Sequence, residues 1–318
     1  MGLYYSMIEW ETNRTGRTPS GRFIPQEAMD EYGIPLDRYV DDHVVPQLQE
    51  LVTRYQPAVI FSDAGEWDED EEFWKTKEFL AWLYNTAPNK DEVVVNDRWA
   101  KGMVGRHGDY YSSEYQDLEG VGASHPWEES RGMGRSYGYN RAENINHYRT
   151  SKELVHELID VVSRGGNLLL NVGPTADGRI PVIMQQRLRD MGAWLQINGE
   201  AIYGTLAWVP SGTPSPDGAS SSSGGNSEIR FTRRGPDLYA HLLEWPEGEV
   251  RIDGLDHTEG LDRTEGITVE LLGFEGPIEW RLEDGSLFFT PPLMSPSEVP
   301  RPYAFVFKIS AGAPPPSA

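Results

Sequence analysis

The sequence predicts an α/β protein followed by a domain of antiparallel strands. Up to about Trp208, strand-like runs alternate with amphipathic helices, which is the pattern of βα units around a parallel sheet. After a Ser-, Gly- and Pro-rich segment at 210–226, short alternating strands with close turns indicate an antiparallel β-sandwich. We therefore expect one domain at residues 1–209, a second at 210–310, and a disordered tail at 311–318.

Hydrophobic periodicity and turn residues determine the expected elements. Apolar side chains recur at three- and four-residue spacing over Leu36–Tyr55, so we expect a helix there, which Pro46 should kink or divide. Thr150 and Glu153 match a capping box that opens another helix, and Leu168–Leu170 predict a strand buried on both faces. The other expected elements are strands at 2–8, 58–61, 93–95, 228–232, 238–243, 250–252, 267–271 and 304–309, a helix around 73–84, and a last helix with Met184, Leu188, Met191 and Leu195 on one stripe.

Charge and composition exclude several classes of function. Asp and Glu total 50 against 28 Lys and Arg, which gives a formal net charge of −22. A surface this anionic repels nucleic acids and anionic membranes, so neither is an expected partner. The absence of cysteine excludes disulfides, thiolate metal sites and a Cys nucleophile. The 10 Trp and 15 Tyr suit a protein that stacks on sugars, although ordinary core and surface positions explain most of them.

The chain carries no pattern of a targeting, membrane-spanning or metal-binding segment. No apolar run approaches the ~18–20 residues of a membrane span, and no signal-peptide pattern opens the chain. The first residues instead have the pattern of a strand, so we expect the parent protein to begin before Met1, and the compartment stays unassigned. The acidic run 68–72 lacks the spacing of an EF-hand loop, and the seven His include no HExxH-type pair. We therefore expect no metal and no organic cofactor.

Two carboxylates near predicted strands are the candidates for chemistry. Asp63 stands where the buried run 58–61 ends and a Gly-containing loop begins, which is where a βα barrel places its active-site residues. Glu114 lies in a loop after a strand and is flanked by aromatic residues, surroundings that suit a general acid. Glycoside hydrolysis needs such a pair. On spacing alone, a loop-capping role for Asp63 is the simpler explanation, so both alternatives stay open.

Arg98 ends the strand predicted at 93–95 and has two explanations as well. Its guanidinium could steady a carboxylate or donate to a sugar hydroxyl. A surface ion pair with Asp97 or with a nearby Glu accounts for it equally well.

Several ordered segments carry more specific information. The longest are SRGGNLLLNVGPTADGRI at 163–180 and WLQINGEAIYGT at 194–205. The others are GLYYS at 2–6, the helix at 39–57, FSD at 61–63, the segment 73–85, VVNDRW at 94–99, PWE at 126–128 and SYGY at 136–139. In this order, they resemble glycoside hydrolase family 29, the α-L-fucosidases.

The resemblance implies an incomplete (β/α)8-like barrel over 1–209, followed by a C-terminal antiparallel β-sandwich. It implies that Asp63 is a nucleophile that forms a covalent fucosyl-enzyme intermediate. It implies that Glu114 is the acid/base residue, which is placed differently between branches of the family. In a retaining enzyme the two carboxyls should lie ~5–5.5 Å apart. The expected substrate-binding residues are Tyr5, Phe61, Trp67 and Arg98, with Phe61 where some relatives have Trp.

The resemblance also implies that part of the barrel is missing. Family members have further barrel strands before the Tyr-Tyr-Ser strand, with a His-His pair that grips fucose, and His43, His107 and His125 do not match that pair. We therefore expect either a truncated form or a homo-oligomer or second chain that completes the barrel, because open strand edges favour association.

The first functional hypothesis is a retaining exo-α-L-fucosidase that acts on fucosylated oligosaccharides or glycoconjugates. The alternative is a catalytically silent fucose- or carbohydrate-binding protein. A transfucosylating enzyme is a third option.

Overall fold

The computed structural model describes residues 1–8, 36–64, 69–115, 125–208, 220–221, 228–255 and 266–310. The chain forms two compact units, the first of Met1–Ser112 with His125–Trp127, the second of Ser113–Ser124 with Glu128–Ala318. The predicted α/β fold with a C-terminal antiparallel β-sandwich is confirmed. The expected domain boundary at 209/210 and the expected tail at 311–318 lie outside the described residues.

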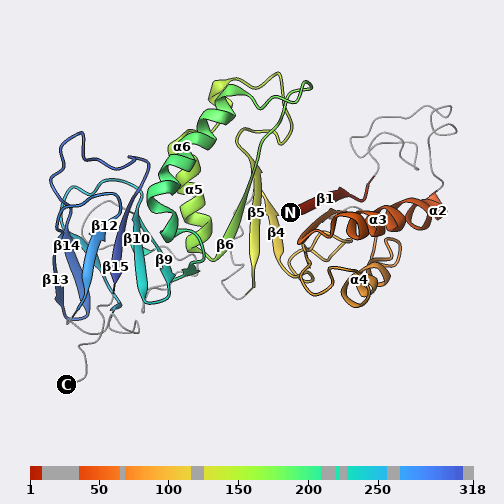
Figure 1. Cartoon of the computed structure of the whole chain (residues 1–318), viewed down its shortest axis with the longest axis horizontal. Coiled ribbons are helices and arrows are strands. Elements are labelled where there is room, and N and C mark those ends of the chain that lie inside the picture. The colour runs from red at the N-terminus through yellow and green to blue at the C-terminus, as the bar shows by residue number, and fades with distance from the viewer. Residues whose placement is uncertain are drawn as a thin grey trace. The chain divides into compact units, whose positions relative to one another are not determined.

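The first unit is built on a parallel sheet of strands β1 (Gly2–Ser6), β2 (Val59–Asp63) and β3 (Val94–Val95), in that order. Helices α3 (Val45–Tyr55) and α4 (Thr76–Asn85) pack on this sheet (Figure 1). The buried side chains of these helices and of the sheet include Leu48, Val52, Ile60, Phe79, Leu83 and Val95.

The helix predicted over Leu36–Tyr55 is divided, as expected from Pro46. Helix α2 (Leu36–Tyr39) continues into a π-helical turn η1 (Val40–Val44), and the N–H of Val45 donates to the carbonyl of Val40. Helix α3 then begins, with Pro46 in its first turn. Proline is tolerated at that position because the first N–H groups of a helix have no partner within it.

The second unit begins with strands β4 (Tyr111–Glu114), β5 (Trp127–Gly132) and β6 (Gly166–Asn171), in the order β4-β5-β6. The chain crosses between the two units within β4 and β5. The prediction that Leu168–Leu170 are buried on both faces is wrong, because Leu169 is 40% exposed and its neighbours are only half-buried. In the described part of the sheet β6 is an edge strand, so one side of it lacks a neighbour.

Two helices cover this sheet. Helix α5 (Ser151–Ser163) opens on the predicted capping box, in which Thr150 and Glu153 bond reciprocally. Helix α6 (Val182–Asn198) buries Met184, Met191 and Trp194. The placement of Leu188 on the buried stripe is wrong, since this side chain is 40% exposed. At 100° per residue, Trp194 lies on the other side of Met191 from Leu188, so the large indole moves the buried face away from the leucine.

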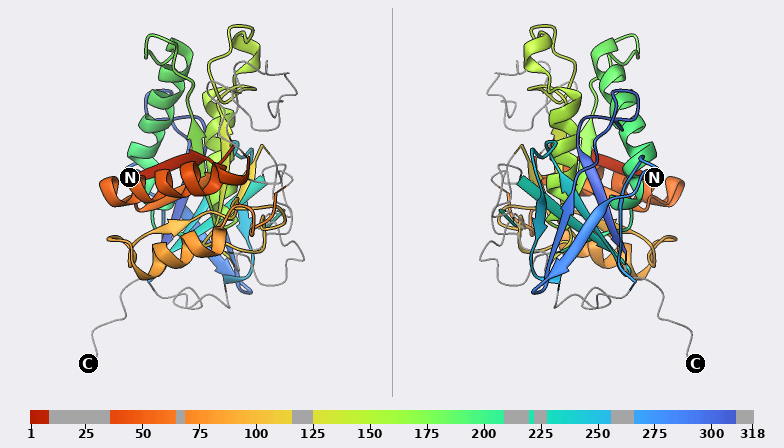
Figure 2. Two further views of the ribbon diagram at one scale, coloured as in Figure 1. Left: turned by 90° about the vertical axis from the view of Figure 1, so that its right-hand side faces the viewer. Right: turned by 90° about the vertical axis from the view of Figure 1, so that its left-hand side faces the viewer.

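The rest of the second unit is a β-sandwich (Figure 2). The larger sheet has the order β12-β15-β10-β9-β7, with β8 paired to β9, and the smaller has the order β11-β14-β13. Their strands are β7 (Leu206–Ala207), β8 (Ser220–Ser221), β9 (Glu228–Arg234), β10 (Asp237–Leu242), β11 (Val250–Ile252), β12 (Thr268–Leu271), β13 (Glu279–Glu283), β14 (Ser286–Thr290) and β15 (Phe305–Ser310). All five strands expected here are present, whereas β7, β8, β13 and β14 were not expected.

Strand β10 is buried on both faces, which makes the helices and the sandwich one unit. Leu238 and Leu242 point into the core between the two sheets, whereas Tyr239 points into the core beneath α5 and α6. Figure 1 shows these helices between the β4-β5-β6 sheet and the larger sheet of the sandwich. The indole N–H of Trp194 donates to the carbonyl of Ala304 at 3.0 Å, which ties α6 to the chain that enters β15.

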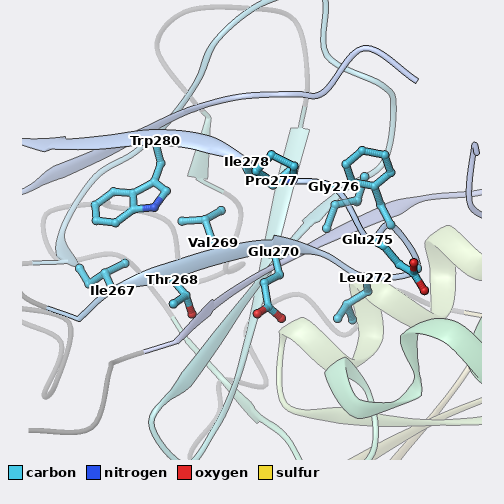
Figure 3. Close-up of a pocket in the computed structure, with 13 residues that line it drawn as sticks. Ile267, Thr268, Val269, Glu270, Leu272, Glu275, Gly276, Pro277, Ile278 and Trp280 are labelled. Atoms are coloured by element: carbon cyan, nitrogen blue, oxygen red, sulfur yellow. The ribbon is translucent and has the colours of Figure 1, made fainter. Parts of the chain in front are cut away.

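A groove of about 690 Å³ opens between β12 and β13 (Figure 3). It is lined by these two edge strands and by the loop between them, with Trp280 on one side and Glu270 and Glu275 on the other. None of the five predicted site residues that the structure describes lines it.

His241 of β10 makes the stability of the second unit depend on pH. The ring is completely buried, and its Nε2 lies 2.9 Å from Thr232 Oγ1, whose own proton is donated to the carbonyl of Ala201. Burial lowers the pKa of His241 from 6.5 to about 3. The unfolded chain therefore takes up a proton below pH 6.5 that the folded chain does not bind until about pH 3.

We predict that the free energy of unfolding falls as pH falls through this window. His241 should contribute up to about 1.4 kcal/mol per pH unit, because unfolding is coupled to uptake of one proton. Urea unfolding of wild type and His241→Gln at several pH values below 6.5 checks this. The variant should show a weaker pH dependence, and an identical slope in both proteins would contradict it.

Candidate active site

Asp63 ends strand β2 and is contacted by two neighbouring side chains. The hydroxyl of Tyr4 donates to Asp63 Oδ2 at 2.6 Å, and Nη1 of Arg98 lies 3.8 Å from Oδ1. The Asp63 side chain is 25% exposed and that of Arg98 12%. The carboxylate is thus held in place but still reachable from solvent.

The register of the sheet explains why these groups meet. Tyr4 is paired with Phe61 in the parallel ladder, and Phe61 and Asp63 are two residues apart, so all three point to one face. The rings of Tyr4 and Phe61 stack at 5.8 Å, and the guanidinium of Arg98 lies 5.5 Å from the Phe61 ring centre. Of the predicted residues, the structure brings Asp63, Phe61 and Arg98 together here.

The structure does not bring Tyr5 to this site. Its hydroxyl donates to Gln47 of α3 at 2.8 Å, on the opposite face of the sheet. Burial raises the pKa of this phenol. Tyr4, which the sequence analysis passed over, has the place expected for Tyr5. A period-two reading would have found it, because apolar Leu3 and Met7 share a face with Tyr5 and leave Tyr4 on the other.

Arg98 is held from behind by a short chain of hydrogen bonds. Its Nε donates to Ser112 Oγ at 2.8 Å, and that hydroxyl donates to Asp97 Oδ1 at 2.6 Å. Asp97 is completely buried and also accepts from the N–H of Gly105 at 2.8 Å. The Arg98 side chain, only 12% exposed, therefore lies within this network and against Asp63.

The side chain of Asn96 holds the carboxyl ends of β2 and β3 side by side. Its amide is completely buried; Oδ1 accepts from the backbone N–H of Ser62 at 3.0 Å, and Nδ2 donates to the carbonyl of Ser62 at 2.9 Å. One side chain thus replaces a pair of ladder bonds just before Asp63. The sequence analysis missed this role, because an Asn at a strand end is also typical of an ordinary turn.

Two predicted residues are not placed beside Asp63. Trp67 lies outside the described residues. Glu114 ends β4 with an exposed side chain, and it belongs to the second unit while Asp63 belongs to the first. The expected separation of their carboxyls stays a prediction.

Among the residues that the structure describes, no group of three or more His, Asp or Glu could hold a metal ion. Within the same residues, no helix has the length and apolar character that crossing a bilayer demands.

Known proteins match the chain along most of its length. A model of the alpha-L-fucosidase family matches residues 1–200, and a model of the alpha-L-fucosidase C-terminal domain matches residues 225–310. The chain is 35% identical to the human tissue alpha-L-fucosidase over 312 residues, 97% of this chain and 61% of the relative. It is 36% identical to the alpha-L-fucosidase of Branchiostoma floridae, over 97% of this chain and 63% of the relative. The chain thus spans less than two thirds of these relatives.

Solved structures of fucosidases also match most of the chain. The alpha-fucosidase of Thermotoga maritima in complex with a mechanism based inhibitor is 32% identical, with a TM-score of 0.70, over 97% of this chain and 64% of that one. Its complex with fucose has a TM-score of 0.69, with 32% identity over the same shares.

We predict that Asn96→Ala destabilises the first unit by about 1–3 kcal/mol, because it leaves the buried N–H and carbonyl of Ser62 without partners. Asn85→Ala is the matched control, since Asn85 is exposed and makes one hydrogen bond, to the carbonyl of Ala81. That control should change stability by less than about 0.5 kcal/mol. Urea unfolding measures the free energy of unfolding of both variants. Equal losses of stability would contradict a stabilising role of the Asn96 hydrogen bonds to Ser62.

Proposed function

The chain belongs to the α-L-fucosidase family, glycoside hydrolase family 29, and we propose that it is a retaining exo-α-L-fucosidase. The observation that carries the proposal is the partly exposed Asp63 carboxylate, held by Tyr4 and Arg98 at the carboxyl end of a parallel strand. Active sites of βα folds lie at that end of the strands. The matches to fucosidases of known structure support the same function.

In the proposed reaction, Asp63 is the nucleophile. Its Oδ2 accepts the Tyr4 hydrogen bond, which leaves Oδ1, 3.8 Å from the Arg98 cation, to attack the anomeric carbon. The bond from Oδ1 to that carbon forms as the glycosidic bond breaks, giving a fucosyl ester of Asp63. The mechanism based inhibitor bound by the Thermotoga relative is consistent with a covalent step.

Glu114 is the proposed acid/base residue. It ends β4 with an exposed side chain, as a group that must reach a bound glycoside requires. The Glu114 carboxyl protonates the leaving oxygen in the first step. As carboxylate it then takes a proton from the water that cleaves the ester and releases L-fucose.

The proposed substrates are fucosylated oligosaccharides or glycoconjugates. The stacked rings of Tyr4 and Phe61 offer an apolar surface beside Asp63, as sugar rings require. A neutral sugar is also indifferent to the net charge of −22. The expected homo-oligomer, or second chain that completes the barrel, stays a proposal that the mass of the assembled particle would test.

We predict that Asp63→Ala lowers kcat/KM on an aryl α-L-fucoside at least about 1,000-fold. Azide should partly restore turnover and give a fucosyl azide of inverted configuration, since the small anion attacks where the carboxylate stood. Asp91→Ala, which removes an exposed carboxylate paired with Lys90, is the control and should be unaffected. Fucose binding by wild type without any turnover would instead favour the carbohydrate-binding alternative.

Tyr4→Phe and Tyr5→Phe form a matched pair, because each removes one phenolic hydroxyl from the same strand. We predict a drop in kcat of about 10- to 100-fold for Tyr4→Phe, the value of a hydrogen bond to a charged group. Tyr5→Phe should stay within about threefold, because its hydroxyl bonds to Gln47 rather than to Asp63. The pair is compared by steady-state kinetics, and an equal or reversed ranking would refute the assignment of Tyr4.

A further inference from the structure

Tyr115, which directly follows Glu114, has a strained backbone. Its backbone dihedral φ is 52°, in the left-handed region that residues other than Gly, Asn and Asp rarely adopt. Such a conformation persists only where the surroundings hold it, and it is enriched at functional sites. The contacts of Tyr115 therefore indicate which function the strained backbone supports.

Three contacts hold the Tyr115 ring. Its hydroxyl oxygen accepts from the N–H of Gly132 at 3.0 Å, and its ring meets Tyr137 edge-to-face at 5.1 Å. The guanidinium of Arg131 lies over the ring, 5.3 Å from its centre. A Cβ at position 132 would stand 2.6 Å from the backbone carbonyl of Ser136 and 2.7 Å from the Tyr115 hydroxyl, so only glycine fits here.

The groups that hold Tyr115 are themselves anchored in the second unit. Arg131 pairs with Glu157 of α5, which also pairs with Arg149 at 3.2 Å. Tyr137 is fixed through its carbonyl, which accepts from Asn171 Nδ2 of β6 at 2.8 Å. The clamp on Tyr115 thus connects the end of β4 to β5, to β6 and to a helix.

Glu114 lies between this clamp and a buried anchor. On its other side, Ser113 is buried and donates to the buried carboxylate of Glu129 in β5. The backbone at Glu114 is therefore fixed from both directions, whereas its side chain is exposed. From this arrangement we propose that Tyr115 is a positioning residue that aims the carboxyl of Glu114 at the leaving oxygen. The inference rests on the proposed role of Glu114 as acid/base residue.

A comparison of leaving groups tests this role. An α-L-fucoside of 2-chloro-4-nitrophenol departs without a proton, whereas a fucosyl disaccharide needs one from the general acid. Tyr115→Gly keeps the left-handed backbone without strain but removes the clamp. We expect it to lower kcat/KM on the disaccharide by about 10- to 100-fold, the effect of misplacing a catalytic group, and on the activated fucoside by less than about threefold. Tyr115→Phe, which retains both ring contacts, should lose less on the disaccharide.

The controls separate this inference from the proposed function. Asp284→Gly relieves the same kind of backbone, with φ of 49°, in the β13–β14 turn, and should leave both rates unchanged. Glu114→Gln should show the same selective loss on the disaccharide. Suppose that Glu114→Gln shows the selective loss of kcat/KM on the disaccharide. If Tyr115→Gly then shows no such loss, or loses kcat/KM equally on both substrates, the positioning role of Tyr115 is overturned while the proposed function stands. If Glu114→Gln retains kcat/KM on both substrates, the acid/base assignment of Glu114 fails and the positioning role fails with it. If wild type turns over neither substrate, the proposed function itself fails.

Discussion

The buried amide of Asn96 ties the carboxyl ends of two parallel strands together, and the proposed site is built on that tie. By replacing a pair of ladder bonds at Ser62, it sets Asp63 and Arg98 at neighbouring strand ends. The buried Asp97 then holds Ser112, and Ser112 holds Arg98. Tyr4 is exposed and Asp63 is partly exposed, whereas Asn96, Asp97 and Ser112, which hold the strand ends and Arg98, are buried. Packing of the first unit therefore determines the geometry around Asp63, and this preorganisation is what catalysis by a fixed carboxylate requires.

Asp63, Phe61 and Arg98 lie close together, because each follows or ends a strongly apolar strand of the same parallel sheet; their roles at the site stay predictions. Tyr5 was expected in the place that Tyr4 takes, although the alternation of Leu3, Tyr5 and Met7 already favours Tyr4 for the other face of the strand. The strand register determines which of the two tyrosines faces Asp63. That register is set by the parallel pairing of Tyr4 with Phe61, which are far apart in the sequence. The strain at Tyr115 had no sequence signal at all, because its cause lies in Gly132 and Tyr137 on other segments.

Elements of the fold were predictable where a local signal, such as a helix cap or a proline, determines the structure. They were less predictable where packing against other elements determines it. The Pro46 division and the Thr150 cap depend on local chemistry, so the sequence was enough for both. The buried face of α6 was misjudged, because the bulk of Trp194 outweighs an additional leucine. An unbroken apolar run such as Leu168–Leu170 indicates a strand, but how deeply it is buried depends on the neighbours that the sheet supplies. Strand β13 alternates polar with apolar residues over only five positions, and β14 is a run of three apolar residues between Ser286 and Thr290; both are weak signals.

Trapping the covalent intermediate tests the central claim most directly. A 2-deoxy-2-fluoro-α-L-fucosyl fluoride forms the ester quickly and releases it slowly, because the fluorine destabilises the cationic transition state. Mass spectrometry of the intact chain and of its peptides would then locate the sugar. We predict a single adduct of one fluorofucosyl group on Asp63, absent from Asp63→Ala. An adduct on another carboxylate, or turnover that continues with no adduct at any dose, would contradict Asp63 as the nucleophile.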